Sequence, residues 1–389
     1  MSRVAILASL AIVTGAVCTG EKSSPPIGRL EFAEKAVAGG PSDLMVIRHL
    51  TLKGTNVEIG QKLAEIARDR HGALGKGPAD TKQLDWLESF YPEQYARSIG
   101  AGKTFGLAPK EAPVDLGYNM SPPGCSVVYY PGSSVSNGHA MLSRNYDFPT
   151  GTYSQITGAA ASPGARSMTG DPYVIEMHPD KGYASLFICS YDLLGGAIDG
   201  VNEKGVAVAL LADDMSSDKQ PKAGYGLSEL SLPRFVLDKC ATAKEAREKL
   251  RSAPYFYTFT PCHYMICDAS GDSFVWETRA DLSRRFTVEG KGAPQIVTNH
   301  LLGEYDAQNL PSGNSFDRFR SLQGELAKRK THSPAQVKEN NFCAAVPKEA
   351  SGHATLWHSV YDLEKKTMQV SFYLGPGRRT EYFEFALGK

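Results

Sequence analysis

The early part of the chain carries apolar residues at the spacing of a helix. Ile59, Leu63 and Ile66 recur three or four positions apart, which places them on one face of a helix. Thr55 or Asn56 can cap the start of this helix, because short polar side chains accept hydrogen bonds from its first free backbone N–H groups. We therefore expect an amphipathic helix that packs against the core soon after the chain begins.

Later in the chain, short runs rich in apolar residues are separated by turn residues, which is typical of strands. The predicted strands lie at 44–52, 126–130, 140–144, 173–177, 184–190, 206–212, 262–268, 273–278, 295–298, 355–362, 367–373 and 382–387. The other predicted elements are helices at 83–99, 228–239, 244–250 and 315–330, a loose lead-in at 21–42 and a Gly-rich turn at 195–205. Strands and helices are segregated rather than alternating, which favours an α+β fold of two antiparallel sheets flanked by helices.

The N-terminus has the pattern of a signal peptide. In residues 1–20, Arg3 precedes an apolar run at 4–13 that is too short to span a bilayer, and small residues follow. We expect a protein exported to the periplasm or secreted. Cys18 leaves open the alternative of a lipoprotein anchored through this cysteine, although Val17 stands where lipoprotein processing sites favour a smaller residue. No later stretch predicts a membrane span.

Composition and charge narrow the range of functions. The 389 residues carry 42 basic and 42 acidic side chains, so no basic excess points to nucleic acid. The seven cysteines show neither CxxC pairs nor zinc spacing, and we expect neither a metal nor another cofactor. The sequence leaves open whether the protein forms a homo-oligomer. One disulfide also stays open among five cysteines, namely Cys189, Cys240, Cys262, Cys267 and Cys343.

The strongest chemical signal is the sequence PPGCS at 122–126. Cys125 follows a glycine at the start of an apolar run, and Arg144 and Asp147 stand three residues apart shortly afterwards. If the chain were cut between Gly124 and Cys125, the new α-amine could act as base for the thiol of its own residue, because such an amine titrates near pH 8. Each residue alone also fits a plainer role: a buried strand cysteine, a salt-bridging arginine and a turn cap.

Several short segments, taken in order, resemble the cysteine N-terminal nucleophile (Ntn) hydrolases. This family includes choloylglycine hydrolases, penicillin V acylases and isopenicillin N acyltransferase-like (peptidase C45-like) proteins. The resemblance extends from about Ile47 to the C-terminus. The segments are GTNVEIG at 54–60, GC at 124–125, RNYD at 144–147, DGVNEKG at 199–205, TNH at 298–300, SFDR at 315–318 and LWHSVYD at 356–362.

The resemblance implies a four-layer αββα sandwich and a self-processing chain. It divides the sequence into a signal peptide at 1–20, a pro-region at 21–124 and a catalytic domain at 125–389. It also implies that Cys125 is the nucleophile, that Arg144 favours its thiolate, and that Asp147 accepts from its α-amine.

Further roles follow from the same resemblance. Asn299 would offer its side-chain N–H₂ to the developing oxyanion, and the backbone N–H of Ala212 would be the second donor. Arg318 matches the late arginine of the family, with Arg320 close enough to leave the choice between them open.

The implied activity is hydrolysis of a linear, non-peptide carboxamide bond of a small N-acyl substrate through a thioester. An acyltransferase that passes the acyl group to an amine, or a catalytically silent binding protein, are the alternatives. A papain-like enzyme would instead pair Cys125 with His263, His300 or His358, without the sequence signature of that class. A metal hydrolase is disfavoured because HExxH and clustered ligand spacing are missing from the sequence.

Overall fold

The computed structural model describes residues 29–75, 81–117, 124–158, 167–213, 222–279, 281–347 and 352–388. The expected signal peptide at 1–20, with Cys18, lies outside these residues, as do Pro122 and Pro123 before the expected cleavage site. Within the described ranges, none of the helices combines the length and apolar character needed to cross a bilayer. The six cysteines found there are not joined in disulfides, so the bridge that the sequence left open does not form among them.

One sheet has nine strands in the order β1-β2-β5-β6-β7-β8-β9-β10-β11. Neighbouring strands are antiparallel except β2 and β5, which are parallel and therefore need a long crossover; helices and the β3–β4 hairpin lie between them in sequence. The bounds are β1 Glu31–Ala38, β2 Ile47–Gly54, β5 Tyr173–Pro179, β6 Ser185–Cys189, β7 Asp199–Asn202, β8 Val206–Ala212, β9 Cys262–Asp268, β10 Ser273–Thr278 and β11 Arg285–Glu289.

The second sheet has seven strands and is antiparallel throughout. Its order is β12-β3-β4-β13-β14-β15, and β16 also pairs with β14. The bounds are β3 Gly124–Tyr130, β4 Met141–Pro149, β12 Gln295–Val297, β13 His353–Asp362, β14 Thr367–Gly375, β15 Arg378–Arg379 and β16 Phe383–Ala386. The hairpin β3–β4 lies where the SNG turn at 136–138 predicts it.

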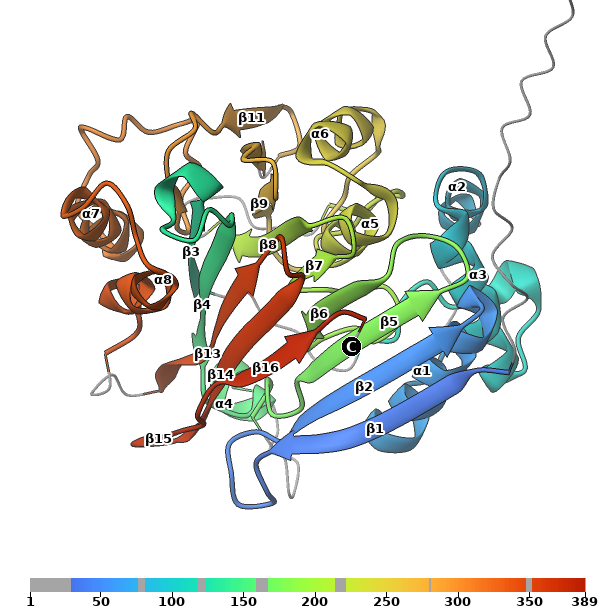
Figure 1. Cartoon of the computed structure of the whole chain (residues 1–389). Coiled ribbons are helices and arrows are strands. Elements are labelled where there is room, and N and C mark those ends of the chain that lie inside the picture. Colours follow the sequence, from blue (N-terminus) through green and yellow to red (C-terminus); the bar gives the residue numbers. More distant parts are fainter. Residues whose placement is uncertain are drawn as a thin grey trace, which may run out of the picture.

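Helices cover the outer faces of both sheets, which gives four layers (Figure 1). On the nine-stranded side, α1 contacts β2, α5 contacts β7 and β8, and α6 contacts β9 and β10, whereas α7 and α8 contact β12 and β4 of the other sheet. This confirms the expected α+β sandwich. The bounds are α1 Asn56–His71, α2 Lys82–Phe90, α3 Pro92–Phe105, α4 Tyr153–Thr157, α5 Ser231–Lys239, α6 Ala243–Ser252, α7 Asn314–Ala327 and α8 Pro334–Asn340.

The segment before Cys125 is an integral part of this sandwich. Residues 31–38, expected to be a loose lead-in, instead form β1 along the edge of the nine-stranded sheet. Thr55 caps α1 through a capping box with Glu58. The backbones of α1 and α3 pack so closely that a Cβ on Gly60 would lie 2.0 Å from the carbonyl oxygen of Arg97. The absence of a side chain at Gly60 therefore allows α1 and α3 to pack in direct backbone contact.

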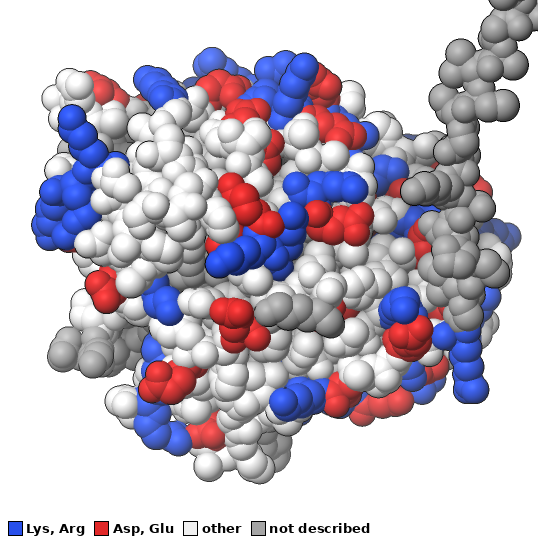
Figure 2. Space-filling view, viewed as in Figure 1, with Lys and Arg blue, Asp and Glu red and all other residues white. Residues whose placement is uncertain are grey.

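The surface carries no single-sign region on the face shown in Figure 2, as far as its described residues go. Lys and Arg side chains are interspersed there with Asp and Glu side chains. The interspersion agrees with a formal net charge of zero for the whole chain.

Candidate active site

Cys125 is the second residue of β3, in the interior of the seven-stranded sheet between β12 and β4. Because side chains alternate along a strand, Cys125 shares a face with Val127 and Tyr129, and all three belong to the main hydrophobic core between the sheets. The cysteine side chain is fully buried. Its sulfur therefore lies in the interior of the sandwich, at the start of the strand.

Arg144 of β4 reaches the sulfur directly. Its Nη2 donates to Cys125 Sγ at 3.0 Å and to the carbonyl oxygen of Leu210 at 2.7 Å. Nη1 donates to Asp199 Oδ1 at 2.5 Å, and both side chains of this ion pair are fully buried. A guanidinium group with fixed partners on one side is held rigidly enough to place its remaining N–H on a thiolate.

Asp199 is a member of this site that the sequence did not single out. Its Oδ2 accepts hydrogen bonds from Ser359 Oγ at 2.7 Å and from the Tyr361 hydroxyl at 2.8 Å. The residue opens the segment DGVNEKG, which we expected to lie within a Gly-rich turn, but residues 199–202 form β7. The signal available in the sequence was that Asp199 is the first residue of DGVNEKG, a segment that resembles one of the family's motifs. Its role as the carboxylate partner of Arg144 could not be found from spacing, because the two residues are 55 positions apart in the sequence and meet only in the folded chain.

Burial and charge act on the Cys125 thiol in opposite directions. Burial raises the pKa of the thiol to about 11 and the Asp147 carboxylate adds to this, whereas the positive charges of Arg144 and Arg318 oppose it. In the uncut chain the thiol is therefore protonated at neutral pH, although a cation already stands at the position where the thiolate would form.

Asn299 and Arg318 hold the backbone of Cys125. The Cys125 N–H donates to Asn299 Oδ1 at 2.7 Å, and Arg318 Nη1 donates to the Cys125 carbonyl oxygen at 2.5 Å. Arg318 Nη2 also donates to Asn299 Oδ1, at 2.7 Å. Asn299 Nδ2 donates to the carbonyl oxygen of Ala212 at 2.8 Å, so the expected oxyanion residues lie side by side. Their roles toward a substrate stay predictions.

Asp147 lies opposite Gly124 in the register of β3 and β4, and so beside the bond expected to be cut. Its Oδ1 accepts from Thr355 Oγ1 at 2.5 Å, while Oδ2 is buried without a hydrogen bond and lies 3.8 Å from Arg318 Nη1. Burial raises the pKa of this carboxyl to about 6, against the opposing effects of Arg318 and Thr355. In the uncut chain the Cys125 N–H points to Asn299 rather than to Asp147.

The alternative candidates lie elsewhere. Arg320 is exposed on α7, where it pairs with Asp317 at 2.7 Å and donates to the carbonyl of Pro311 at 2.5 Å. Of the two late arginines, Arg318 is therefore the one that meets Cys125.

The three histidines of the papain-like alternative bind other partners. His263 Nδ1 lies 3.2 Å from Glu277 Oε1, and His300 Nδ1 lies 2.9 Å from Ser315 Oγ. His358 Nδ1 lies 2.5 Å from the hydroxyl of Tyr382. The geometry thus pairs the sulfur with an arginine rather than with an imidazole.

Aromatic side chains close the site on the side of β4. Tyr146 is opposite Cys125 in the strand register, stacks on Trp357 with ring centroids 3.8 Å apart, and lies 4.9 Å from the Arg144 guanidinium. Its hydroxyl hydrogen-bonds to that of Tyr191. These rings exclude water around the ion pair of Arg144, which strengthens its electrostatic effect on the sulfur.

One group within the described ranges could offer three ligand atoms to a metal ion, and it lies away from this site. His139, Asp362 and Glu364 have ligand atoms within 4.8 Å of one another. They flank the far ends of β3, β4 and β13, where His139 Nδ1 lies 2.9 Å from Asp362 Oδ2 and Glu364 Oε1 accepts from the N–H of Ala140 at 3.0 Å.

A family model described as acyl-coenzyme A:6-aminopenicillanic acid acyl-transferase matches residues 134–375, which is more than half of the chain. The chain belongs to this family. The match confirms the resemblance drawn from the sequence motifs and supports an enzyme that acts on amides. It includes Arg144, Asp147, Asn299 and Arg318 and begins after Cys125.

Two solved structures are similar to the chain over about two thirds of its length. Penicillin V acylase from Agrobacterium tumefaciens is 21% identical, with 68% of this chain and 87% of that chain covered and a TM-score of 0.48. A mutant of conjugated bile acid hydrolase from Clostridium perfringens is 14% identical, with 68% and 92% covered and a TM-score of 0.44. No curated protein sequence matches the chain.

Proposed function

We propose that the chain is an autoprocessing cysteine amidase that cleaves a linear, non-peptide N-acyl amide through a thioester on Cys125. The observation that carries the proposal is the contact of 3.0 Å between Arg144 Nη2 and Cys125 Sγ, combined with the clamp that Asn299 and Arg318 form on the backbone of the same residue. Family membership supports the reaction class.

The first step of the proposal is the cut between Gly124 and Cys125. The Cys125 sulfur attacks the Gly124 carbonyl carbon, the peptide C–N bond breaks, and the nitrogen takes the proton that the thiol loses. Water then hydrolyses the resulting thioester, which leaves a free α-amine on Cys125 and a carboxylate on Gly124. The Cys125 side chain is completely buried and Gly124 is half-buried, so a separate protease has restricted access to the bond and a cut from within the chain is favoured.

The second step is turnover of the substrate. The free α-amine, with an ordinary pKa near 8, takes the thiol proton, and Arg144 stabilises the thiolate. The thiolate attacks the carbonyl of the amide, and the α-amine gives its proton to the leaving amine. Asn299 Nδ2 and the backbone N–H of Ala212 are proposed to hold the oxyanion, with Nδ2 turning from the carbonyl oxygen of Ala212 to the substrate. Asp147 and Arg318 orient that amine and the Cys125 carbonyl.

A second candidate is acyl transfer, because the matching family model describes an acyl-transferase. The thioester would then be attacked by an amine rather than by water. Export through the segment 1–20 belongs to either version and predicts that the N-terminus is missing from protein recovered outside the cytoplasm.

Trapping of the acyl-enzyme tests the proposal. The processed protein is mixed with a panel of N-acyl amino acids, and intact mass is recorded with and without hydroxylamine. The acyl group should add to the chain that starts at Cys125, and hydroxylamine should release it as a hydroxamate. Recovery of a new N-acyl product when an amino acid is added as acceptor, in preference to the free acid formed with water, favours the transferase. If no substrate turns over and no adduct forms, the protein is a binding protein and the amidase proposal is wrong.

A further inference from the structure

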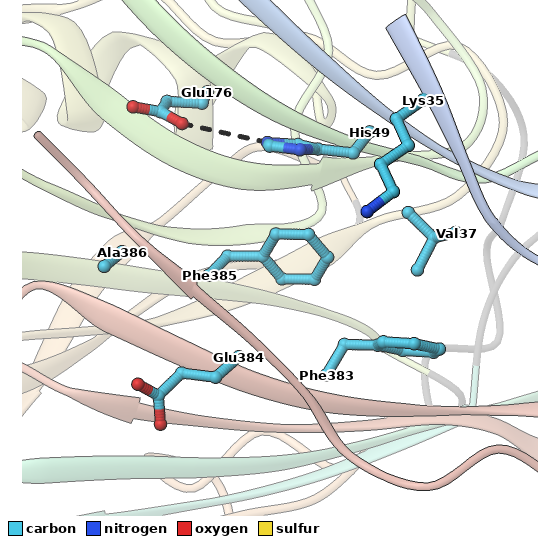
Figure 3. Close-up of a pocket in the computed structure, with 8 residues that line it drawn as sticks. All are labelled: Lys35, Val37, His49, Glu176, Phe383, Glu384, Phe385 and Ala386. Carbon is cyan, nitrogen blue, oxygen red and sulfur yellow. Dashed lines mark ion pairs between the residues drawn. The ribbon is translucent and has the colours of Figure 1, made fainter. Parts of the chain in front are cut away.

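A cavity of about 410 Å³ opens at the margin of the sandwich, between β1, β2 and β5 of the nine-stranded sheet and β16 of the other. Figure 3 shows Lys35 extending from β1 toward the cavity, with the rings of Phe383 and Phe385 facing it. The cavity has a volume typical of small-molecule sites. None of its lining residues belongs to the site around Cys125.

The lining combines an aromatic floor with two polar atoms that have no hydrogen-bond partner among the described residues. His49 Nε2 is buried without a hydrogen bond, and its nearest carboxylate oxygen, on Glu176, is 3.8 Å away. Lys35, which stands opposite His49 in the strand register, forms neither an ion pair nor a hydrogen bond with the described residues. An ammonium group and a neutral imidazole can both donate hydrogen bonds.

Of the two carboxylates of the lining, Glu176 lies between two histidines, with its Oε2 3.8 Å from His49 Nε2, and Glu384 has a partner outside the cavity. Glu176 Oε1 lies 2.7 Å from His178 Nε2 and also accepts from the N–H of Gly388 at 3.5 Å. Glu384 accepts from Gln369 Nε2 at 2.9 Å, and it alternates with Phe383 and Phe385 along β16, so it points to the other side of the strand. Lys35 is then the charged side chain of the lining that has no partner among the described residues, so a ligand that neutralises it carries negative charge.

The apolar part of the lining determines the rest of the ligand. The His49 and Phe385 rings lie 4.8 Å apart between their centroids, and Val37 and Phe383 continue the apolar surface beside them. Two phenylalanine rings and a valine bind an alkyl or aryl group by excluding water from it.

We propose that this cavity binds an amphiphilic monocarboxylate, with its carboxylate between Lys35 and His49 and its alkyl or aryl tail on Phe383 and Phe385. The site is separate from Cys125, and the proposal does not depend on the amidase mechanism.

Titration calorimetry with sodium decanoate, below its micelle concentration, tests the site. The full-length protein should bind one decanoate here, and Lys35→Ala should weaken that binding at least tenfold. Phe385→Ala should weaken it similarly, because the tail loses its main contact. The matched control is Lys53→Ala, since Lys53 is an exposed lysine on the neighbouring strand that pairs with Glu31 instead. Lys53→Ala should leave the affinity unchanged.

Two further ligands sharpen the test. Decan-1-ol has the same tail but no charge, and decylamine has the same tail with a positive charge. Neither can pair with the Lys35 ammonium, so both should bind at least tenfold more weakly than decanoate. The proposal is overturned if decanoate does not bind, if Lys35→Ala binds it as tightly as the unchanged protein, or if the three ligands bind equally. Amide turnover should be the same in Lys35→Ala and in the parent, so failure of this site and failure of the amidase proposal are distinguishable.

Discussion

Two arginines from different elements converge on Cys125, and each contacts a different part of it. Arg144 of β4 contacts the sulfur, whereas Arg318 of α7 contacts the carbonyl oxygen. Arg144 is fully buried with Asp199, so its removal would leave an unpaired buried carboxylate and cost about 3–5 kcal/mol of stability. Loss of activity in Arg144→Ala would therefore mix chemistry with folding, which makes Arg318 the clearer probe.

Arg318 and Arg320 provide a matched pair on one helix. We expect Arg318→Ala to lower kcat/KM by two orders of magnitude or more, because the clamp on Cys125 and Asn299 is lost. Arg320→Ala should leave kcat/KM within about twofold, because its partners are Asp317 and backbone carbonyls at the surface. Steady-state kinetics on processed protein measures both. Equal effects of the two substitutions on kcat/KM would contradict the role proposed for Arg318 in catalysis.

Asp147 should make stability depend on pH. Burial raises its pKa from an ordinary 3.8 to about 6, so the folded state holds the carboxyl proton more tightly than the unfolded state does. The stability that this proton provides is fully present below pH 3.8 and is lost as the pH rises through 6. Above pH 6 the free energy of unfolding is therefore lower by about 3 kcal/mol than below pH 3.8, as far as this group contributes. Asp147→Asn removes the buried charge and should therefore be more stable than its parent at pH 7.5, with the difference shrinking toward pH 4.

Urea denaturation between pH 4 and 8 checks this, with both proteins carrying Cys125→Ala so that both remain uncut under the proposed mechanism. Asp317→Asn, at an exposed carboxylate on α7, is the control and should show little effect at any pH. A lower stability of Asp147→Asn at pH 7.5, or a difference that does not change with pH, would contradict the expectation.

The residues of the site were predictable from the sequence to different degrees. Cys125, Arg144 and Asp147 could be found because they lie in two neighbouring strands of one hairpin, where short motifs preserve their spacing. Asp199, Thr355 and Tyr191 were missed because they reach the site through contacts made only in the folded chain. Sequence spacing says nothing about such contacts.

At the scale of elements, most strands from Cys125 onward lie where short apolar runs predict them, while the N-terminal segment did not behave as expected. The strand β8 has the predicted bounds, and β3 and β4 extend the predicted strands. Residues 31–38 instead became an edge strand whose side chains are mostly exposed, so no alternation of apolar and polar residues marked it. The helical region predicted at 83–99 splits into α2 and α3 before Pro92, which begins the second helix.

This arrangement leads to a prediction for the N-terminal fragment after the proposed cut. β2 pairs with β5 along seven residues, and α1 packs its buried face beside it. Removal of this fragment would leave the backbone edge of β5 unpaired, so the two fragments should stay associated after cleavage. Native mass spectrometry should find both in one particle, and only denaturant should separate them.

The uncut variant Cys125→Ala is the size standard for that experiment, since it has the same composition in one chain apart from the single substitution. A large fragment that remains folded and active after the small one is washed away would show that the N-terminal segment is a removable pro-peptide.

For the molecule as a whole, the four-layer architecture determines what the site can do. Sandwiching Cys125 between two sheets removes water from its sulfur, and the same burial raises the pKa of the uncut thiol to about 11. A thiol held protonated in this way is a weak nucleophile toward an external substrate. The proposed cut resolves this by placing an α-amine next to the sulfur, so that processing and activity become linked events.

The central claim is therefore best tested by N-terminal sequencing and intact mass of the purified protein, next to Cys125→Ala and Cys125→Ser. We predict two chains for the unchanged protein, the larger running from Cys125 to Lys389. Cys125→Ala should remain one chain without activity, and Cys125→Ser should cut slowly, because a hydroxyl is a weaker nucleophile than a thiolate. An active enzyme that remains a single chain through Gly124 and Cys125 would contradict the N-terminal nucleophile mechanism.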